Sequence, residues 1–260
     1  MKGCWVSVLP VMAGFAPGGA AFAASPMPWY EPEAVRGDPL VAISRCGINY
    51  EYARETSSRE KFVPNATWQL GAKDGKNDWA LGIEVPVLIN NAKWAPSEEG
   101  LGDLKVKVAY NALDDGQWLL GGYFETEGDT ADTDVEAIAN QRTQMALGGG
   151  FIRSLGSGWS VGAALQYGWS LDAGTTTGCK SEWELRIGAR KTLVGQLNLT
   201  VVYKQVFGFA GEDSYSASVE PSLSWGFGAE RKCSLWVACE VPVQNKSEDF
   251  TAKGGFAWLF

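Results

Sequence analysis

The residues that can carry chemistry in this sequence are carboxylates, lysines and arginines, because the chain contains no histidine. Histidine is the commonest general base of enzymes, and the hydrolytic triads depend on it. A Ser–Lys arrangement remains open, with Lys204 or Lys253 as the lysine, although the sequence places no serine beside either. We therefore predict that the chain has no catalytic residues, binds no cofactor and is not an enzyme.

One pair of carboxylates has a spacing that chemistry can use. In a hairpin that turns near residue 230, cross-strand positions sum to about 460, which sets Glu220 opposite Glu240. Two facing carboxylates can share a proton or bind a cation. The alternative, which we favour, is that Arg186 or Arg190 neutralises them.

The same arithmetic applies to the hairpin that turns about Gly116. It sets Lys105 opposite Glu125 and predicts a cross-strand ion pair.

The segment from Glu125 to Glu136 holds six acidic residues and no basic one. Oxygen ligands at this density can bind a divalent cation. Because the full EF-hand pattern is missing, we favour a solvated loop, or one that cations bridge to lipopolysaccharide. The cysteines are scattered, so we expect unpaired thiols and no metal site.

The elements that position these residues are segments in which apolar side chains take every second place. This period is typical of β-strands. Twelve such segments follow one another, an even number as in single-chain bacterial barrels. They are residues 40–52, 66–72, 79–89, 104–110, 118–124, 145–151, 159–171, 183–189, 197–203, 219–227, 235–241 and 250–260.

The charged side chains all fall on the other face of these segments. A slip of one residue in the strand 182–190 would turn four charges toward lipid, at about 2–4 kcal/mol for each arginine at the midplane. We therefore predict an all-β fold, a 12-stranded antiparallel transmembrane barrel whose charges point inward. The inward charges are Arg45, Glu51 and Lys73, together with thirteen that we expect to line the pore: Glu84, Lys105, Lys107, Glu125, Arg142, Glu182, Glu184, Arg186, Arg190, Lys204, Glu220, Glu240 and Lys253.

Loop lengths and aromatic residues predict how such a barrel sits in a membrane. Short connections alternate with long ones, as in outer-membrane barrels with tight periplasmic turns. Trp79, Trp118 and Trp159 begin strands after short turns, while Tyr50 and Trp183 lie toward the long loops, so both water boundaries carry aromatic rings. A soluble β-sandwich is the alternative, but it would bury its aromatic residues between its sheets.

The N-terminal region reads as a leader. Residues 1–23 combine Lys2, an apolar stretch broken by prolines, and Ala21-Phe22-Ala23, which together predict a secretory signal peptide rather than a membrane-spanning helix. Residues 24–39 are expected to be a periplasmic segment, and residues 40–260 the barrel.

Two motifs resemble known proteins. Gly100-Leu101-Gly102-Asp103-Leu104, continuing to Tyr110 and Asn111, resembles the outer-membrane family named for a meta-pathway of phenol degradation, mainly over residues 80–170. This resemblance implies a transporter or channel barrel. The final strand ends at Phe260 and looks like the signal by which the barrel-assembly machinery recognises outer-membrane barrels.

The expected function follows from the barrel and its charge. A net charge of −8 without a Lys/Arg-rich tract excludes nucleic acid as a partner. Twelve strands give a backbone diameter of about 23 Å, so we predict a passive, weakly selective channel for small hydrophilic or amphipathic solutes in the Gram-negative outer membrane, in contact with lipid and lipopolysaccharide. The alternative is a sealed structural or surface-interaction barrel that acts through loops 91–102 and 127–140.

Overall fold

The structure, a computed structural model, describes twelve stretches of the chain. They are residues 44–54, 58–70, 78–91, 98–114, 117–128, 130, 143–171, 181–194, 197–209, 214–227, 233–244 and 250–259. Several predicted features lie outside these residues: the signal peptide, the segment 24–39, Lys73, Arg142, Phe260, half of loop 91–102 and most of loop 127–140. The side chain of Arg45 is also outside them.

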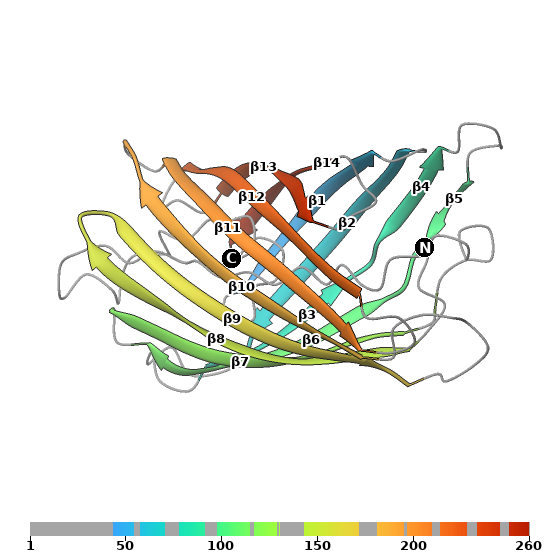
Figure 1. Cartoon of the computed structure of the whole chain (residues 1–260), viewed down its shortest axis with the longest axis horizontal. Helices are drawn as coiled ribbons and strands as arrows, with labels where there is room; N and C mark the ends of the chain where they lie inside the picture. The colour runs from blue at the N-terminus through green and yellow to red at the C-terminus, as the bar shows by residue number, and fades with distance from the viewer. Residues whose placement is uncertain are drawn as a thin grey trace.

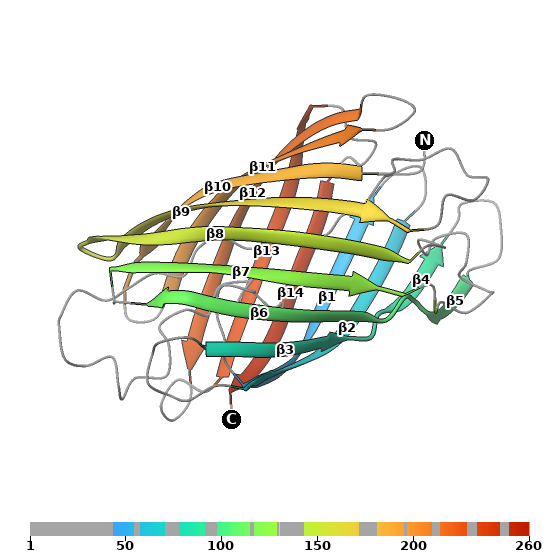
Figure 2. The same cartoon turned by 90° about the horizontal axis from the view of Figure 1, so that it is seen from below.

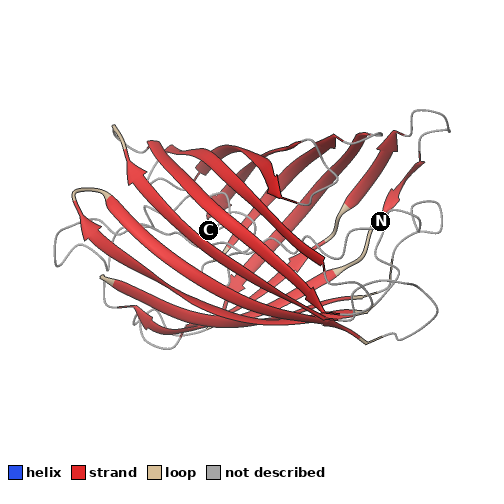
Figure 3. Ribbon diagram, in the orientation of Figure 1, coloured by secondary structure: helices blue, strands red, loops and turns tan. Residues whose placement is uncertain are grey.

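The described residues form strands and connecting loops (Figures 1 and 3). The strands are β1 (Arg45–Arg54), β2 (Ser58–Gln69), β3 (Asp78–Glu84), β4 (Val87–Asn91), β5 (Glu98–Leu101), β6 (Lys105–Asp114), β7 (Trp118–Glu127), β8 (Gln144–Gly156), β9 (Trp159–Ser170), β10 (Ser181–Thr192), β11 (Leu197–Phe209), β12 (Ser214–Phe227), β13 (Cys233–Gln244) and β14 (Phe250–Leu259). None of the described residues belongs to a helix long and apolar enough to cross a membrane.

All pairings between neighbouring strands are antiparallel, and the sheet closes on itself. β1 pairs with β2 on one side and with β14 on the other, from Arg45 opposite Leu259 to Arg54 opposite Phe250. Figure 2 shows the resulting barrel, in which β1 and β14 lie side by side.

The fourteen strand segments form a barrel of twelve strands, because β3 and β4 are two parts of one interrupted strand, and so are β5 and β6. β3 and β4 both pair with β2 in one unbroken register, Asn65 opposite Glu84 and Phe62 opposite Val87. β5 pairs with β4, and β6 pairs with β3. The described strands therefore confirm the predicted closed, 12-stranded antiparallel barrel.

The interruption has a chemical cause in Pro64 and Pro86, which have no N–H to donate. The Val85 N–H donates to the Pro64 carbonyl at 3.1 Å, and the Gly102 N–H donates to the Pro86 carbonyl at 2.8 Å. The cross-strand pairs Pro64–Val85 and Pro86–Gly102 thus each keep one of their two backbone hydrogen bonds. The ladder is weakened here without a change in strand direction.

The predicted phase of the strands is confirmed. Ile48, Leu147 and Val237 lie on the outer face and are each more than half exposed, whereas Glu184 and Arg186 on the inner face are about 1–2% exposed. Such a wall turns its apolar side chains outward and its charges inward, the arrangement that a hydrocarbon surrounding requires.

Aromatic residues ring both ends of this outer face. Trp68, Trp79, Trp159, Trp225 and Trp258 lie near the short turns and are each 40–53% exposed. Trp183, Phe124 and Phe62 lie nearer the long loops and are exposed to a similar extent. The two girdles predicted from the sequence are therefore present.

Charge on the outer face should be tolerated only near its edges. Val237 lies in the middle of β13 and Val243 one residue from its end, and both are more than half exposed. We expect Val237→Arg to lower the free energy of unfolding in lipid vesicles by about 2–4 kcal/mol and Val243→Arg by about 0–1 kcal/mol. Denaturant titration of the vesicle-inserted barrel measures both, and equal costs would contradict a hydrocarbon-facing wall.

Candidate functional site

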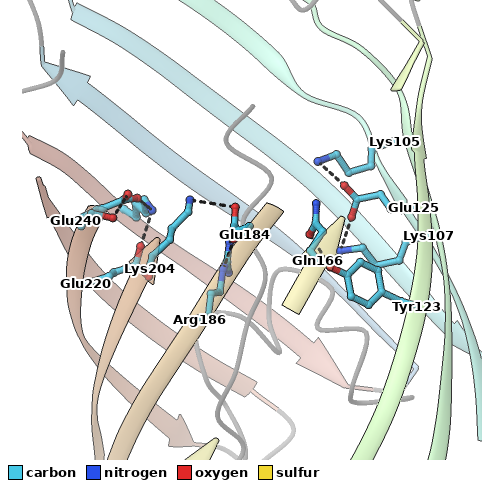
Figure 4. Close-up of polar contacts among 12 residues, drawn as sticks. Lys105, Lys107, Tyr123, Glu125, Gln166, Glu184, Arg186, Lys204, Glu220 and Glu240 are labelled. Atoms are coloured by element: carbon cyan, nitrogen blue, oxygen red, sulfur yellow. Dashed lines mark hydrogen bonds and ion pairs between the residues drawn. The ribbon is translucent and has the colours of Figure 1, made fainter. Parts of the chain in front are cut away.

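Polar side chains on the inner face lie in a row from β6 to β13 (Figure 4). We call this set the inner belt. It comprises Lys105 and Lys107 on β6, Tyr123, Glu125 and Glu127 on β7, Gln166 on β9, Glu184 and Arg186 on β10, Lys204 on β11, Glu220 on β12, Glu240 on β13 and Lys253 on β14.

The first part of the inner belt joins β12, β13 and β14. The Lys253 Nζ donates to Glu220 at 2.5 Å and also to Glu240, which accepts a second hydrogen bond from the Ser218 hydroxyl at 2.7 Å. All four side chains are buried. A single lysine therefore holds two carboxylates that face each other across a hairpin.

This geometry confirms one prediction and adds a partner. Val219 pairs with Val241, so Glu220 does lie opposite Glu240. The cation that holds both carboxylates is Lys253, on the strand next to Glu240, which the sequence analysis did not name as their partner. Arg186 and Arg190, which it did name, are on β10, on the far side of β11.

The second part lies on β10 and β11. Arg186 and Lys204 are direct cross-strand neighbours, and both lie close to the carboxylate of Glu184. Arg186 forms an ion pair with Glu184, and the Lys204 Nζ lies 3.8 Å from its second carboxylate oxygen. One buried carboxylate thus offsets the repulsion between two neighbouring cations.

The third part lies on β6 and β7. The Lys105 Nζ lies 3.1 Å from Glu125 and 3.3 Å from Glu127, and the Lys107 Nζ lies 2.9 Å from Glu125. The predicted Lys105–Glu125 pair is confirmed as a diagonal contact. The residue directly opposite Glu125 is Lys107, because the paired positions of β6 and β7 sum to 232 at this point, whereas a Lys105–Glu125 pair requires a sum of 230.

Tyr123 and Gln166 complete the inner belt, and sequence reasoning missed both. The Tyr123 hydroxyl donates to the Gln166 amide oxygen at 2.5 Å, although β8 lies between their strands. The ring can cross β8 because it lies over Gly148, where a methyl group would overlap it. The available signal was an inward-parity tyrosine beside the run Gly148-Gly149-Gly150.

The same device recurs where the barrel closes. Trp236 on β13 is about 1% exposed. A methyl group at Gly255 of β14 would come within 2.5 Å of the Trp236 indole nitrogen and 2.7 Å of the Asn49 side-chain oxygen of β1. The absence of a side chain at Gly255 lets groups from the strands on either side of β14 meet above it.

Electrostatically the inner belt is balanced. It carries five cations, Lys105, Lys107, Arg186, Lys204 and Lys253, and five carboxylates, Glu125, Glu127, Glu184, Glu220 and Glu240. All but Lys105 are classed as buried, and the Lys105 side chain is only 13% exposed. Removing one partner from such a pair typically costs about 3–5 kcal/mol, since it leaves a buried charge uncompensated.

Three other predicted pore-lining residues, Glu84, Glu182 and Arg190, lie on the inner face outside the inner belt. Glu84 on β3 is the direct cross-strand neighbour of Lys105 on β6. Arg190 donates to the Asn198 side-chain oxygen at 2.7 Å. Glu182 is buried on β10, and Arg142 lies outside the described residues.

The Gly-Asp motif has a structural role at the β5–β6 break. The Asp103 carboxylate accepts a hydrogen bond from the Thr130 N–H at 2.9 Å, and the Thr130 hydroxyl accepts one from the Leu104 N–H at 2.8 Å. Asp103 is buried. These bonds tie Thr130, three residues beyond the end of β7, to the irregular stretch between β5 and β6.

Metal ligation and disulfides are not features of the described residues. No group of three or more His, Cys, Asp or Glu side chains among them could hold a metal ion. Cys46, Cys233 and Cys239 are free thiols. Cys179 and most of the acidic loop after Glu127 lie outside the residues described.

Comparison with known protein sequences is informative about the family of this chain. A family model described as "Putative MetA-pathway of phenol degradation" matches residues 51–260. No curated protein sequence matches the chain significantly.

Among solved structures, the chain is similar to an outer membrane channel from Pseudomonas putida F1, with a TM-score of 0.70 and 12% identity over 85% of this chain and 96% of that one. It is also similar to the NanC porin, with a TM-score of 0.59 and 10% identity over 83% of this chain and 100% of that one. The KdgM porin gives a TM-score of 0.53 at 10% identity, over 82% of this chain and 99% of the other. At these identities the likeness shows a shared outer-membrane barrel fold.

Filling the space under Tyr123 should destabilise the inner belt. We expect Gly148→Ala to lower the free energy of unfolding by about 1–3 kcal/mol, because the new methyl group overlaps the tyrosine ring. Gly168→Ala is the matched control: it lies on the same inner face, and its methyl group would be 3.6 Å from the nearest atom, Cγ of Glu182. Denaturant titration measures both, and Tyr123→Ala should relieve the cost of Gly148→Ala. Equal costs for the two glycines would refute the bridging role of Gly148.

Proposed function

The chain belongs to the family described as "Putative MetA-pathway of phenol degradation", and we propose that it is a passive outer-membrane channel for small hydrophilic or amphipathic solutes. The observation that carries this proposal is the separation of charge in a closed wall. The ten charges of the inner belt point inward, while the middle of the outer face is apolar. A wall of this kind provides a polar path through a hydrocarbon layer.

The inner belt supports weak selectivity and a small cutoff. Five cations and five carboxylates cancel, so the belt favours neither sign of solute. Inward side chains also narrow a wall whose backbone diameter is about 23 Å. Solutes that pass must exchange hydrogen bonds with paired lysines and carboxylates.

The proposal includes a location and partners. The barrel would lie in the Gram-negative outer membrane, with its short turns in the periplasm and its long loops against lipopolysaccharide. Phe260 would be read by the barrel-assembly machinery. Within the described residues, the belt carboxylates are held by lysines or by arginine, which supports a role that is not enzymatic.

A second candidate is a sealed barrel that serves as a structural scaffold or acts through its surface loops. The observation that favours it is the burial of the inner belt, where Glu184, Arg186 and Lys253 are at most 4% exposed. Paired side chains that exclude solvent can close a lumen as well as line it.

Planar-bilayer recording separates the two candidates. The channel proposal expects discrete conductance steps from the purified mature protein, and their absence at every voltage would favour the sealed barrel. Lys204→Gln should then shift selectivity toward cations, and Glu184→Gln toward anions, each by about two- to fivefold in permeability ratio, as expected for roughly 0.5–1 kcal/mol of altered ion interaction.

The matched control for these variants is Arg54→Gln. Arg54 is an exposed cation on the outer face at the long-loop end of β1, so the reversal potential in a salt gradient should not move. If Lys204→Gln and Glu184→Gln also leave the reversal potential unchanged, the inner belt does not line the conducting path.

The proposed leader has its own test. We expect the protein recovered from the outer-membrane fraction to begin at Ala24, because signal peptidase cleaves after small residues such as those of Ala21-Phe22-Ala23. N-terminal sequencing measures this directly. A recovered chain that still carries residues 1–23 would contradict the leader.

A further inference from the structure

Two cations of the outer face lie at its short-turn end, on strands that are separated by one other strand. Arg153 is near the end of β8, and Lys191 is near the end of β10. Both have the parity of outward residues, in line with Phe151 on β8 and with Ile187 and Ala189 on β10. Only β9 separates the two strands.

Each cation rests on a tryptophan of the girdle. The guanidinium carbon of Arg153 lies 4.9 Å from the ring centre of Trp118, its direct cross-strand neighbour. The Lys191 Nζ lies 5.0 Å from the ring centre of Trp159, its own cross-strand neighbour. Because tryptophan rings settle at the membrane–water interface, both cations are held at the depth of lipid headgroups.

The β8–β9 turn fixes one of them further. Ser157 and Gly158 have φ values of 51° and 74°, as in the tight turns that match strand twist. The carbonyl of Ser157 accepts a hydrogen bond from the Lys191 Nζ at 2.6 Å. An ammonium group has three donors, so two remain for a ligand.

Within the part of the chain that the structure describes, neither Arg153 nor Lys191 forms an ion pair with a carboxylate, in contrast to the lysines of the inner belt. Two strand spacings of 4.7–4.9 Å put their backbones about 10 Å apart across the sheet, with Trp159 on the strand between them. The chemistry that complements this patch is an anion at headgroup depth.

We propose that Arg153, Lys191, Trp118 and Trp159 form a binding site for the phosphate of an anionic phospholipid in the leaflet at the short-turn end. The guanidinium can bind phosphate oxygens in a bidentate manner, and the ammonium adds a second contact. The acyl chains then lie along the apolar outer face, over residues such as Phe151 and Val161. This site is independent of the proposed channel.

Native mass spectrometry of the folded mature protein tests the site. Micelles doped with equal amounts of phosphatidylglycerol and phosphatidylcholine supply the probes, and the wild type should retain phosphatidylglycerol preferentially. In the double variant Arg153→Gln/Lys191→Gln this preference should fall by about tenfold, as expected when two interfacial cations are lost. Arg54→Gln, which removes an exposed outward cation at the opposite end, should keep it.

Two results would overturn the proposal. One is an unchanged preference in the double variant, and the other is displacement of the bound lipid by millimolar inorganic phosphate, which would assign the site to a free anion. Both side chains lie at the rim, so the variants should fold, and the heat-dependent gel shift of folded barrels checks this. Conductance of the double variant should equal that of the wild type, so that failure of the lipid site and failure of the channel proposal are distinguishable.

Discussion

The structure depends on one constraint, that no backbone N–H or C=O within a hydrocarbon layer can be left without a partner. Closure of β1 on β14 meets it, since ten residues of β1 pair on both sides. Pro64 and Pro86 are local exceptions, where two neighbouring pairs keep one hydrogen bond each. The strands continue in register past this point, so the chain accepts a weakened ladder here without opening an edge.

Closure in turn decides where charge can go. With the outer face committed to apolar side chains, ionised groups gather inside, where each must find a partner to offset its desolvation. The inner belt solves this by sharing: Lys253 holds two carboxylates, and Glu184 holds two cations. The hydrogen bond from Tyr123 to Gln166 extends such contacts across an intervening strand.

The alternation of apolar and polar residues predicted the number of strands in the barrel and the face on which each side chain lies. The reason is that a strand that spans hydrocarbon cannot slip by one residue without exposing charge. Partners were harder to predict. Lys253 was missed as the partner of Glu220 because hairpin arithmetic relates two strands and says nothing about a third. The Tyr123–Gln166 contact depends on the glycine between them, and the direct partner of Glu125 is Lys107 because paired positions about Gly116 sum to 232 and not to 230.

The seam between β1 and β14 has a topological consequence. Arg45 and Leu259 are direct neighbours, and the indole of Trp236 and the side chain of Asn49 both lie close to Gly255 at the junction. The closed barrel therefore does not depend on which strand comes first in the chain. A circular permutant joined from Leu259 to Arg45 and cut at the Ser157–Gly158 turn would retain every strand pairing of the sheet. The order of the strands along the chain and the architecture of the barrel are therefore separable in this molecule.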